Sequence, residues 1–169
     1  MSSKAAIIFR VLQRDYPEQV CSIARSLEVV GERWTLLILR DAVLGIERFE
    51  DFQRSLGIAS NTLTNRLKLL CAEGVLERVG DPDRPGRPKY VLTGKGRELA
   101  PALIVLMKWG DRHYPAPEGP PRLTLHANCG GSVGADLRCA RCGRYARAGE
   151  IELPPGPGAR PSGERAERD

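Results

Sequence analysis

The sequence predicts a mainly α-helical fold with one small β-hairpin, an α+β arrangement, followed by a separate small module. Three observations lead to this class. Apolar residues recur at helical spacing through the first half of the chain, two short strand-like runs flank a turn rich in proline and glycine, and the composition changes abruptly after Tyr114. A chain of 169 residues has room for one ordinary domain and a small appendage.

Two helices are expected before residue 45. The first runs from Cys21 to Val30, where apolar residues at helical spacing form one face, and it ends at Gly31. The second runs from Trp34 to Val43 and carries four consecutive apolar residues. Such a continuous apolar surface predicts a helix that is buried on most sides.

Two further helices meet at a tight turn. Residues 49–56 form a short amphipathic helix that is expected to end at Gly57. The next helix covers residues 60–74, SNTLTNRLKLLCAEG, with Ser60 expected as its N-cap. Its leucines at positions 63, 67 and 70 share one face. Two short helices joined by the turn GIAS form a helix-turn-helix.

The exposed side of residues 60–74 carries amides, hydroxyls and positive charge, with no acid before Glu73. Residues 54–97 hold nine Lys/Arg against four Asp/Glu, a balance of +5 that equals the formal charge of the whole chain. A helix that enters the DNA major groove needs short polar side chains and must avoid carboxylates near phosphate. The predicted DNA contacts on this helix are Ser60, Asn61, Thr62, Asn65, Arg66 and Lys68. The alternative is that the first-turn residues among them are ordinary helix-start residues.

A β-hairpin follows the second helix of this unit directly. Residues 75–79 and 89–92 are strand-like, and GDPDRPGRP between them forces turns. A hairpin in this place is a wing, so the predicted domain is a winged helix-turn-helix. Arg84, Arg87 and Lys89 are expected at its tip and edge, where they would contact phosphates or a minor groove. The alternative is a solvated hairpin that happens to be basic.

Several of these motifs occur together in one known family. Gly31 opens a G-x-R-W-T-L-x-I-L-R run, Arg48-Phe49 precede further apolar residues, and Leu63 opens L-x-x-R-L-x-x-L-x-x-x-G-x-L-x-R. Tyr90 then opens Y-x-L-T-x-x-G. Over about residues 20–110 the chain resembles the HxlR family of bacterial winged-helix regulators, relatives of the MarR group. The resemblance implies a homodimer that binds a pseudo-palindromic operator on double-stranded DNA, usually as a repressor.

A second copy of the chain has independent support in the helix after Thr93. Leu103 to Met107 are five consecutive apolar residues, so apolar surface surrounds this helix. One side would cover its own domain, and the other would pair with a twofold-related copy through the 99–109 helix and the N-terminal helices. The alternative is a helix buried entirely within its own domain. Pro101 is expected to bend or re-cap this helix.

The C-terminal part reads as a linker over 115–122, a zinc-ribbon-like module over 123–152 and a disordered tail over 153–169. His126 and Cys129 form one ligand pair, and Cys139 and Cys142 form a second pair after nine intervening residues. This spacing predicts a structural zinc site, since metal binding would supply the folding energy that so small an apolar core lacks. The alternatives are a Cys139–Cys142 redox pair or a site without a metal.

Residues 1–19 are a weakly patterned N-terminal extension, and Cys21 after it is a candidate redox sensor. The resemblance to the HxlR family implies a possible role for Cys21, because some members sense oxidants with a cysteine at this position. The simpler interpretation is that Cys21 is a small side chain with no signalling role. The sequence shows no catalytic triad, H-E-x-x-H motif or phosphate-binding glycine loop, so we expect no enzyme. We expect a cytoplasmic protein without a membrane span. Two other functions stay open: a metal- or redox-responsive regulator and a winged-helix protein-interaction module.

Overall fold

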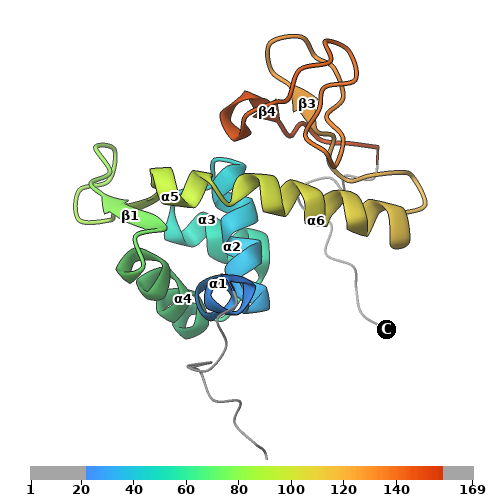
Figure 1. Ribbon diagram of the computed structural model, residues 1–169. Helices are drawn as coiled ribbons and strands as arrows, with labels where there is room; N and C mark the ends of the chain where they lie inside the picture. Colours follow the sequence, from blue (N-terminus) through green and yellow to red (C-terminus); the bar gives the residue numbers. More distant parts are fainter. Residues whose placement is uncertain (1–21, 158–169) are drawn as a thin grey trace, which may run out of the picture.

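The structure is a computed structural model and describes residues 22–157 (Figure 1). The predicted N-terminal extension, Cys21 and residues 158–169 lie outside the described residues. The first domain contains α1 (Ser22–Val30), α2 (Arg33–Val43), α3 (Phe49–Leu56), α4 (Ser60–Ala72), β1 (Leu76–Val79), β2 (Lys89–Leu92), α5 (Gly94–Arg97) and α6 (Ala100–His113). The C-terminal module contains β3 (Leu125–His126), a 3₁₀ turn (Ala148–Glu150) and β4 (Ile151–Glu152). The predicted fold class, mainly helical with a small hairpin, is confirmed.

The core of the first domain lies where α2, α3 and α4 meet. Ile38 of α2, Phe52 of α3 and Leu63 of α4 are fully buried there. Leu67 and Leu70 complete the predicted apolar face of α4, and both are buried. Each such side chain contributes roughly 1.5–3 kcal/mol of transfer free energy, so this face fixes which side of α4 points outward.

The turn between α3 and α4 is tight. Gly57 ends α3 with φ +61°, a left-handed conformation that glycine adopts without strain. The prediction that Ser60 caps α4 is wrong. Ala59 occupies the cap position in an extended conformation, and Ser60 is already the first helical residue. The Oδ1 of Asn61 accepts the backbone N–H of Thr62 at 2.8 Å, so a side chain inside the first turn satisfies one of the free donors.

The predicted hairpin is present, and a third segment pairs with its second strand. β1 and β2 pair antiparallel with Leu76 opposite Leu92 and Val79 opposite Lys89. The backbone N–H of Tyr90 donates to the carbonyl of Glu47 at 2.7 Å, and Arg48 forms a bridge with Lys89. The wing is therefore attached through its second strand to the segment that leads into α3.

The link between the wing and α6 is set by Thr93. Its Oγ1 donates to the carbonyl of Gly74 at 2.7 Å and accepts the N–H of Gly96 at 3.1 Å, so one hydroxyl caps α5 and ties it to the end of α4. A Cβ at Gly96 would lie 2.2 Å from the carbonyl oxygen of Val75. As predicted, Pro101 marks a new helix start, since it is the second residue of α6.

The first helix and α6 leave apolar side chains in solvent. Ala24 of α1 is buried, whereas Ile23 and Leu27 are 70% and 51% exposed. On α6, Ile104 is buried and Trp109 is 48% exposed. The amphipathic face predicted for α1 is therefore only partly covered within one chain.

The C-terminal module lies on the opposite side of α6 from α4 (Figure 1). β3 pairs antiparallel with β4, and Val133 is its fully buried apolar residue. The predicted boundary at residue 152 is too early. Gly156 donates its N–H to the carbonyl of Pro121 at 2.9 Å, and Pro155 bridges Arg122, so residues 153–157 belong to the module. None of the helices in residues 22–157 combines the length and apolarity needed to cross a bilayer.

Candidate nucleic-acid interface and metal centre

The outward face of α4 carries three exposed polar side chains. Asn61, Asn65 and Lys68 are exposed and project opposite the buried leucines, because turns of about 100° place them on the far side of the helix. Thr62 is half-buried beside them, and Ser60 is exposed at the helix start. This face therefore offers amides, hydroxyls and a single ammonium group without a carboxylate.

Arg66 lies apart from that face. Its Nη2 is 2.9 Å from Oε1 of Glu32, and its side chain is only 21% exposed. Its Nε is buried without a hydrogen-bond partner among the described residues. Asn65 and Arg66 were both predicted to contact DNA. In the structure, Asn65 faces outward, whereas Arg66 points toward the start of α2.

The three basic residues of the wing differ in their surroundings. Arg84 is exposed at the tip. Arg87 is 67% exposed, and its Nη1 lies 2.7 Å from Oε1 of Glu50 on α3. Lys89 turns inward, with its Nζ 3.7 Å from Asp81 and 3.8 Å from Glu47. Arg84 and Arg87 are thus available at the surface, whereas Lys89 helps to hold the wing.

A buried carboxylate anchors the wing to α3. Arg48 donates from Nε to Oδ2 of Asp81 at 2.7 Å, and its Nη2 reaches Asp83 at 3.1 Å. The side chain of Asp81 is 1% exposed. The hydrogen bond from Arg48 holds the pKa of Asp81 below its usual value. The pKa of Glu50 is also lowered, first by its own backbone N–H and then by the charge of Arg87.

The four predicted metal ligands meet at one point of the C-terminal module. The ligand atoms of His126, Cys129, Cys139 and Cys142 all lie within 4.8 Å of one another. Nδ1 of His126 is 3.2 Å from Sγ of Cys129 and 3.6 Å from Sγ of Cys142, and the Cys129 and Cys139 sulfurs are 3.4 Å apart. A tetrahedral ion with metal–sulfur bonds of about 2.3 Å needs sulfurs about 3.8 Å apart. The cluster is therefore close to the size that a metal ion requires.

The backbone around the cluster fits a metal knuckle. Gly130 and Gly143 follow ligand cysteines and adopt φ +64° and +69°. A Cβ at Gly131 would lie 2.5 Å from Sγ of Cys139, so this position must be glycine. The backbone N–H of Arg144 is the main cause that lowers the pKa of Cys142 to about 6, which favours the thiolate form that binds metals.

Three acidic residues of this region were not singled out from the sequence. Glu32, Glu50 and Asp81 each hold an arginine that the helix-turn-helix or wing presents. Along the sequence they lie 34, 37 and 33 residues from their arginine partners. Patterns of local spacing do not predict pairs that are so far apart in sequence. Cys71 of α4 lies outside the metal cluster. Burial raises the pKa of its thiol and makes it a poor nucleophile.

Comparison with known proteins decides the family. The model of the family described as HxlR-like helix-turn-helix matches residues 29–118. The chain belongs to this HxlR-like family. An uncharacterized HTH-type transcriptional regulator of Mycobacterium tuberculosis strain H37Rv is 47% identical over 137 residues, which cover 81% of this chain and 87% of the relative. The HTH-type transcriptional regulator YvaP of Bacillus subtilis is 36% identical over 86 residues, covering 50% and 80%.

Solved structures of transcription regulators are similar to this chain as well. PA1607, described as a candidate transcription factor, aligns with a TM-score of 0.56 and 32% identity over 90% of this chain and 97% of its own. The oxidized form of the redox regulator HypR aligns with a TM-score of 0.52 and 29% identity over 57% of this chain and all of its own. Because 90% of this chain is more than the winged helix-turn-helix domain alone, the PA1607 alignment extends beyond that domain.

Proposed function

We propose that this HxlR-like protein is a homodimeric repressor that inserts α4 into the major groove of a pseudo-palindromic operator. The observation that carries the proposal is the outward face of α4, where Asn61, Asn65 and Lys68 are exposed and no carboxylate stands among them. Asn65 can pair with both polar groups of an adenine edge, and Lys68 can neutralise a phosphate. Ser60 and Thr62 at the positive end of the helix suit phosphate oxygens.

The wing completes the interface in this proposal. Arg84 and Arg87 at the tip contact the backbone or an adjacent minor groove, and this contact requires Arg87 to exchange Glu50 for a phosphate. Arg66 and Lys89 support the interface from behind, because both are mostly buried against carboxylates. The original set of predicted contacts thus divides into surface residues and supporting residues.

Dimerisation is proposed through the apolar side chains that one chain leaves uncovered. They project from α1 and α6 and comprise Ile23, Leu27, Val105, Leu106 and Trp109. A twofold copy is the commonest partner for such a surface and would set two α4 helices about one DNA turn, roughly 34 Å, apart. Leu106→Glu should shift the protein to monomer in sedimentation equilibrium, whereas Ser55→Glu, the same charge on the exposed side of α3, should leave the dimer intact.

We further propose that the metal centre binds one zinc ion and serves structure. The four ligands come from a module in which, among the described residues, Val133 and Ala146 are the buried aliphatic side chains, so the ion would take the place of a hydrophobic core. All four ligands converge, whereas a Cys139–Cys142 redox pair would have no need of His126 and Cys129. The zinc holds the C-terminal module in its folded conformation, and no step of DNA recognition depends on the zinc.

The test is DNA binding measured against salt. Footprinting on the DNA upstream of the protein's own gene should reveal two protected half-sites one helical turn apart. The affinity should fall log-linearly with salt concentration, because each neutralised phosphate releases counterions. A reporter driven from that DNA should be repressed by the wild type and derepressed with Asn65→Ala. Binding that ignores salt would favour a protein-interaction module instead.

A further inference from the structure

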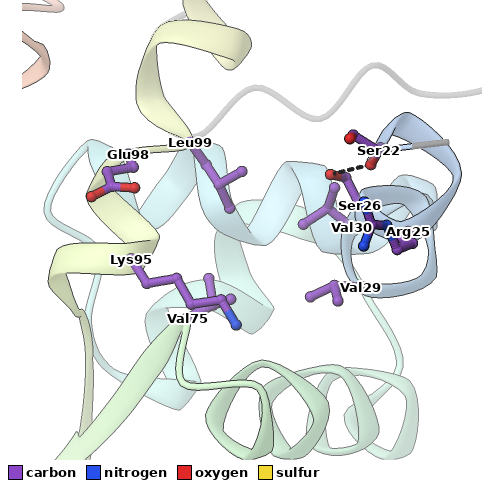
Figure 2. Close-up of a pocket in the computed structure, with 9 residues that line it drawn as sticks. All are labelled: Ser22, Arg25, Ser26, Val29, Val30, Val75, Lys95, Glu98 and Leu99. Atoms are coloured by element: carbon purple, nitrogen blue, oxygen red, sulfur yellow. Dashed lines mark hydrogen bonds between the residues drawn. The ribbon is translucent and has the colours of Figure 1, made fainter. Parts of the chain in front are cut away.

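A hollow of about 540 Å³ lies between α1, the start of β1 and α5 (Figure 2). This volume is within the range of about 300–1,000 Å³ that small-molecule sites occupy. Its apolar part is formed by Val29 of α1, Val75 before β1 and Leu99 before α6. The apolar side chains give the hollow affinity for a ligand with a hydrocarbon body.

Two cationic side chains border the same hollow from different elements. Arg25 comes from α1, and Lys95 comes from α5 (Figure 2). No ion pair involves Arg25 within residues 22–157. The carboxylate of Glu98, also at the edge, points away from α1 in this view. An apolar surface between two cations is complementary to an organic anion.

Lys95 connects the hollow to the end of α4. Its Nζ donates to the carbonyl of Glu73, the residue that caps the C-terminus of α4, at 2.6 Å, and lies 4.0 Å from Oε2 of the same residue. Val75 follows α4 after two residues and lines the hollow. An anion that draws Lys95 away from Glu73 would remove a cation that satisfies the negative end of α4.

We propose that this hollow binds a small monoanionic organic acid with an apolar body, held by Arg25 and Lys95, and that the ligand weakens DNA binding by loosening the end of α4. The binding half of the inference stands on the hollow alone. The regulatory half rests on the proposed function. The two are separable, because ligand binding can be measured without DNA.

The experiment uses 1-naphthoate as the probe and 1-naphthamide, its neutral counterpart, in isothermal titration with the full chain. Naphthoate should bind saturably with one site per chain, and the amide at least tenfold more weakly. Arg25→Gln and Lys95→Gln should each weaken naphthoate at least tenfold. Arg97→Gln removes a cation of α5 that does not line the hollow, so it should bind like the wild type.

A space-filling variant keeps the test decisive if a charge variant unfolds. Ser26→Trp places a large ring in the hollow with both cations intact, and it should abolish binding, whereas Ser26→Ala should retain it. Absence of saturable binding to the full chain, equal binding of acid and amide, or an equal loss in Arg97→Gln would overturn the site. If naphthoate binds but DNA affinity does not fall several-fold in the wild type, the regulatory half is overturned while the site stands.

Discussion

Arg66 of α4 pairs with Glu32 at the N-cap of α2, with Nη2 and Oε1 2.9 Å apart. The pair joins the two elements whose relative orientation decides how α4 is presented. Arg66 is mostly buried, so its main role within the chain is to position α4. Asn65, one residue earlier, is exposed and faces outward. Neighbouring residues on one helix therefore have different expected mutational signatures.

Arg66→Ala should lower the free energy of unfolding by about 1–2 kcal/mol, since it removes a partly buried ion pair and the packing of the arginine stem. The loss stays below that of a fully buried pair because Glu32 is half exposed. Urea denaturation measures it. Lys68→Ala, an exposed cation on the same helix, is the control and should change stability by less than about 0.5 kcal/mol. Equal stabilities of the two variants would contradict the positioning role.

Asn65→Ala should leave stability within about 0.5 kcal/mol and weaken binding to the best operator by about 1–3 kcal/mol. The loss should be confined to one base pair, because a bidentate amide reads a single adenine. Competition binding with operators substituted at each position measures this. Ser55→Ala on the exposed side of α3 is the matched control. A uniform loss across all operators would show that Asn65 contacts the backbone.

Arg87→Ala should weaken all DNA sequences alike and reduce the slope of log affinity against log salt by about one. Glu50→Gln should act in the opposite direction, since Arg87 then meets phosphate without a competing carboxylate 2.7 Å away. Anisotropy titrations over a salt series measure both slopes. Glu77→Gln removes an exposed acid of β1 and separates the effect of net charge from that of the pair. An unchanged slope in Arg87→Ala would contradict the proposal that Arg87 contacts a phosphate.

The stability contribution of Asp81 should depend on pH in a defined direction. Its pKa is lower in the folded chain than the value of about 3.9 in an unfolded one, owing to the hydrogen bond from Arg48. The contribution is therefore fully present above pH 4 and is lost as the pH falls through the folded pKa. Asp81→Asn should lower the urea midpoint at pH 6, and the difference from wild type should shrink below pH 4. Asp83→Asn, at a 76% exposed carboxylate, should show a smaller difference.

Removal of the metal should affect the C-terminal module and spare the helical domain. The wild type should contain one zinc per chain by atomic emission, and Cys139→Ser should lose it, because Cys139 is a buried ligand. Amide exchange should then rise in residues 123–157, while helicity and the urea midpoint of the first domain stay close to wild type. Cys71→Ser, outside the cluster, should retain the metal. Full zinc content in Cys139→Ser would contradict the ligand assignment.

Periodicity, turn chemistry and ligand spacing were sufficient for the local features. Leu63, Leu67 and Leu70 share a face because the helical repeat requires it, and Gly57 ends α3 because few other residues tolerate its backbone conformation. The four residues of the candidate metal site could also be predicted to lie together, since knuckle spacing is a property of short chain segments. These features depend on residues close together in the chain.

Only the tertiary structure decided which charges are free. Arg66, Arg87 and Lys89 all read as exposed cations, yet each has an acidic partner more than thirty residues away. The cap at Ala59 and the extension of the module to residue 157 were likewise set by backbone contacts that no periodicity reports. The sequence determined which elements form and what chemistry they carry. Long-range ion pairing, which depends on where the chain returns in space, determined which side chains remain available to a ligand.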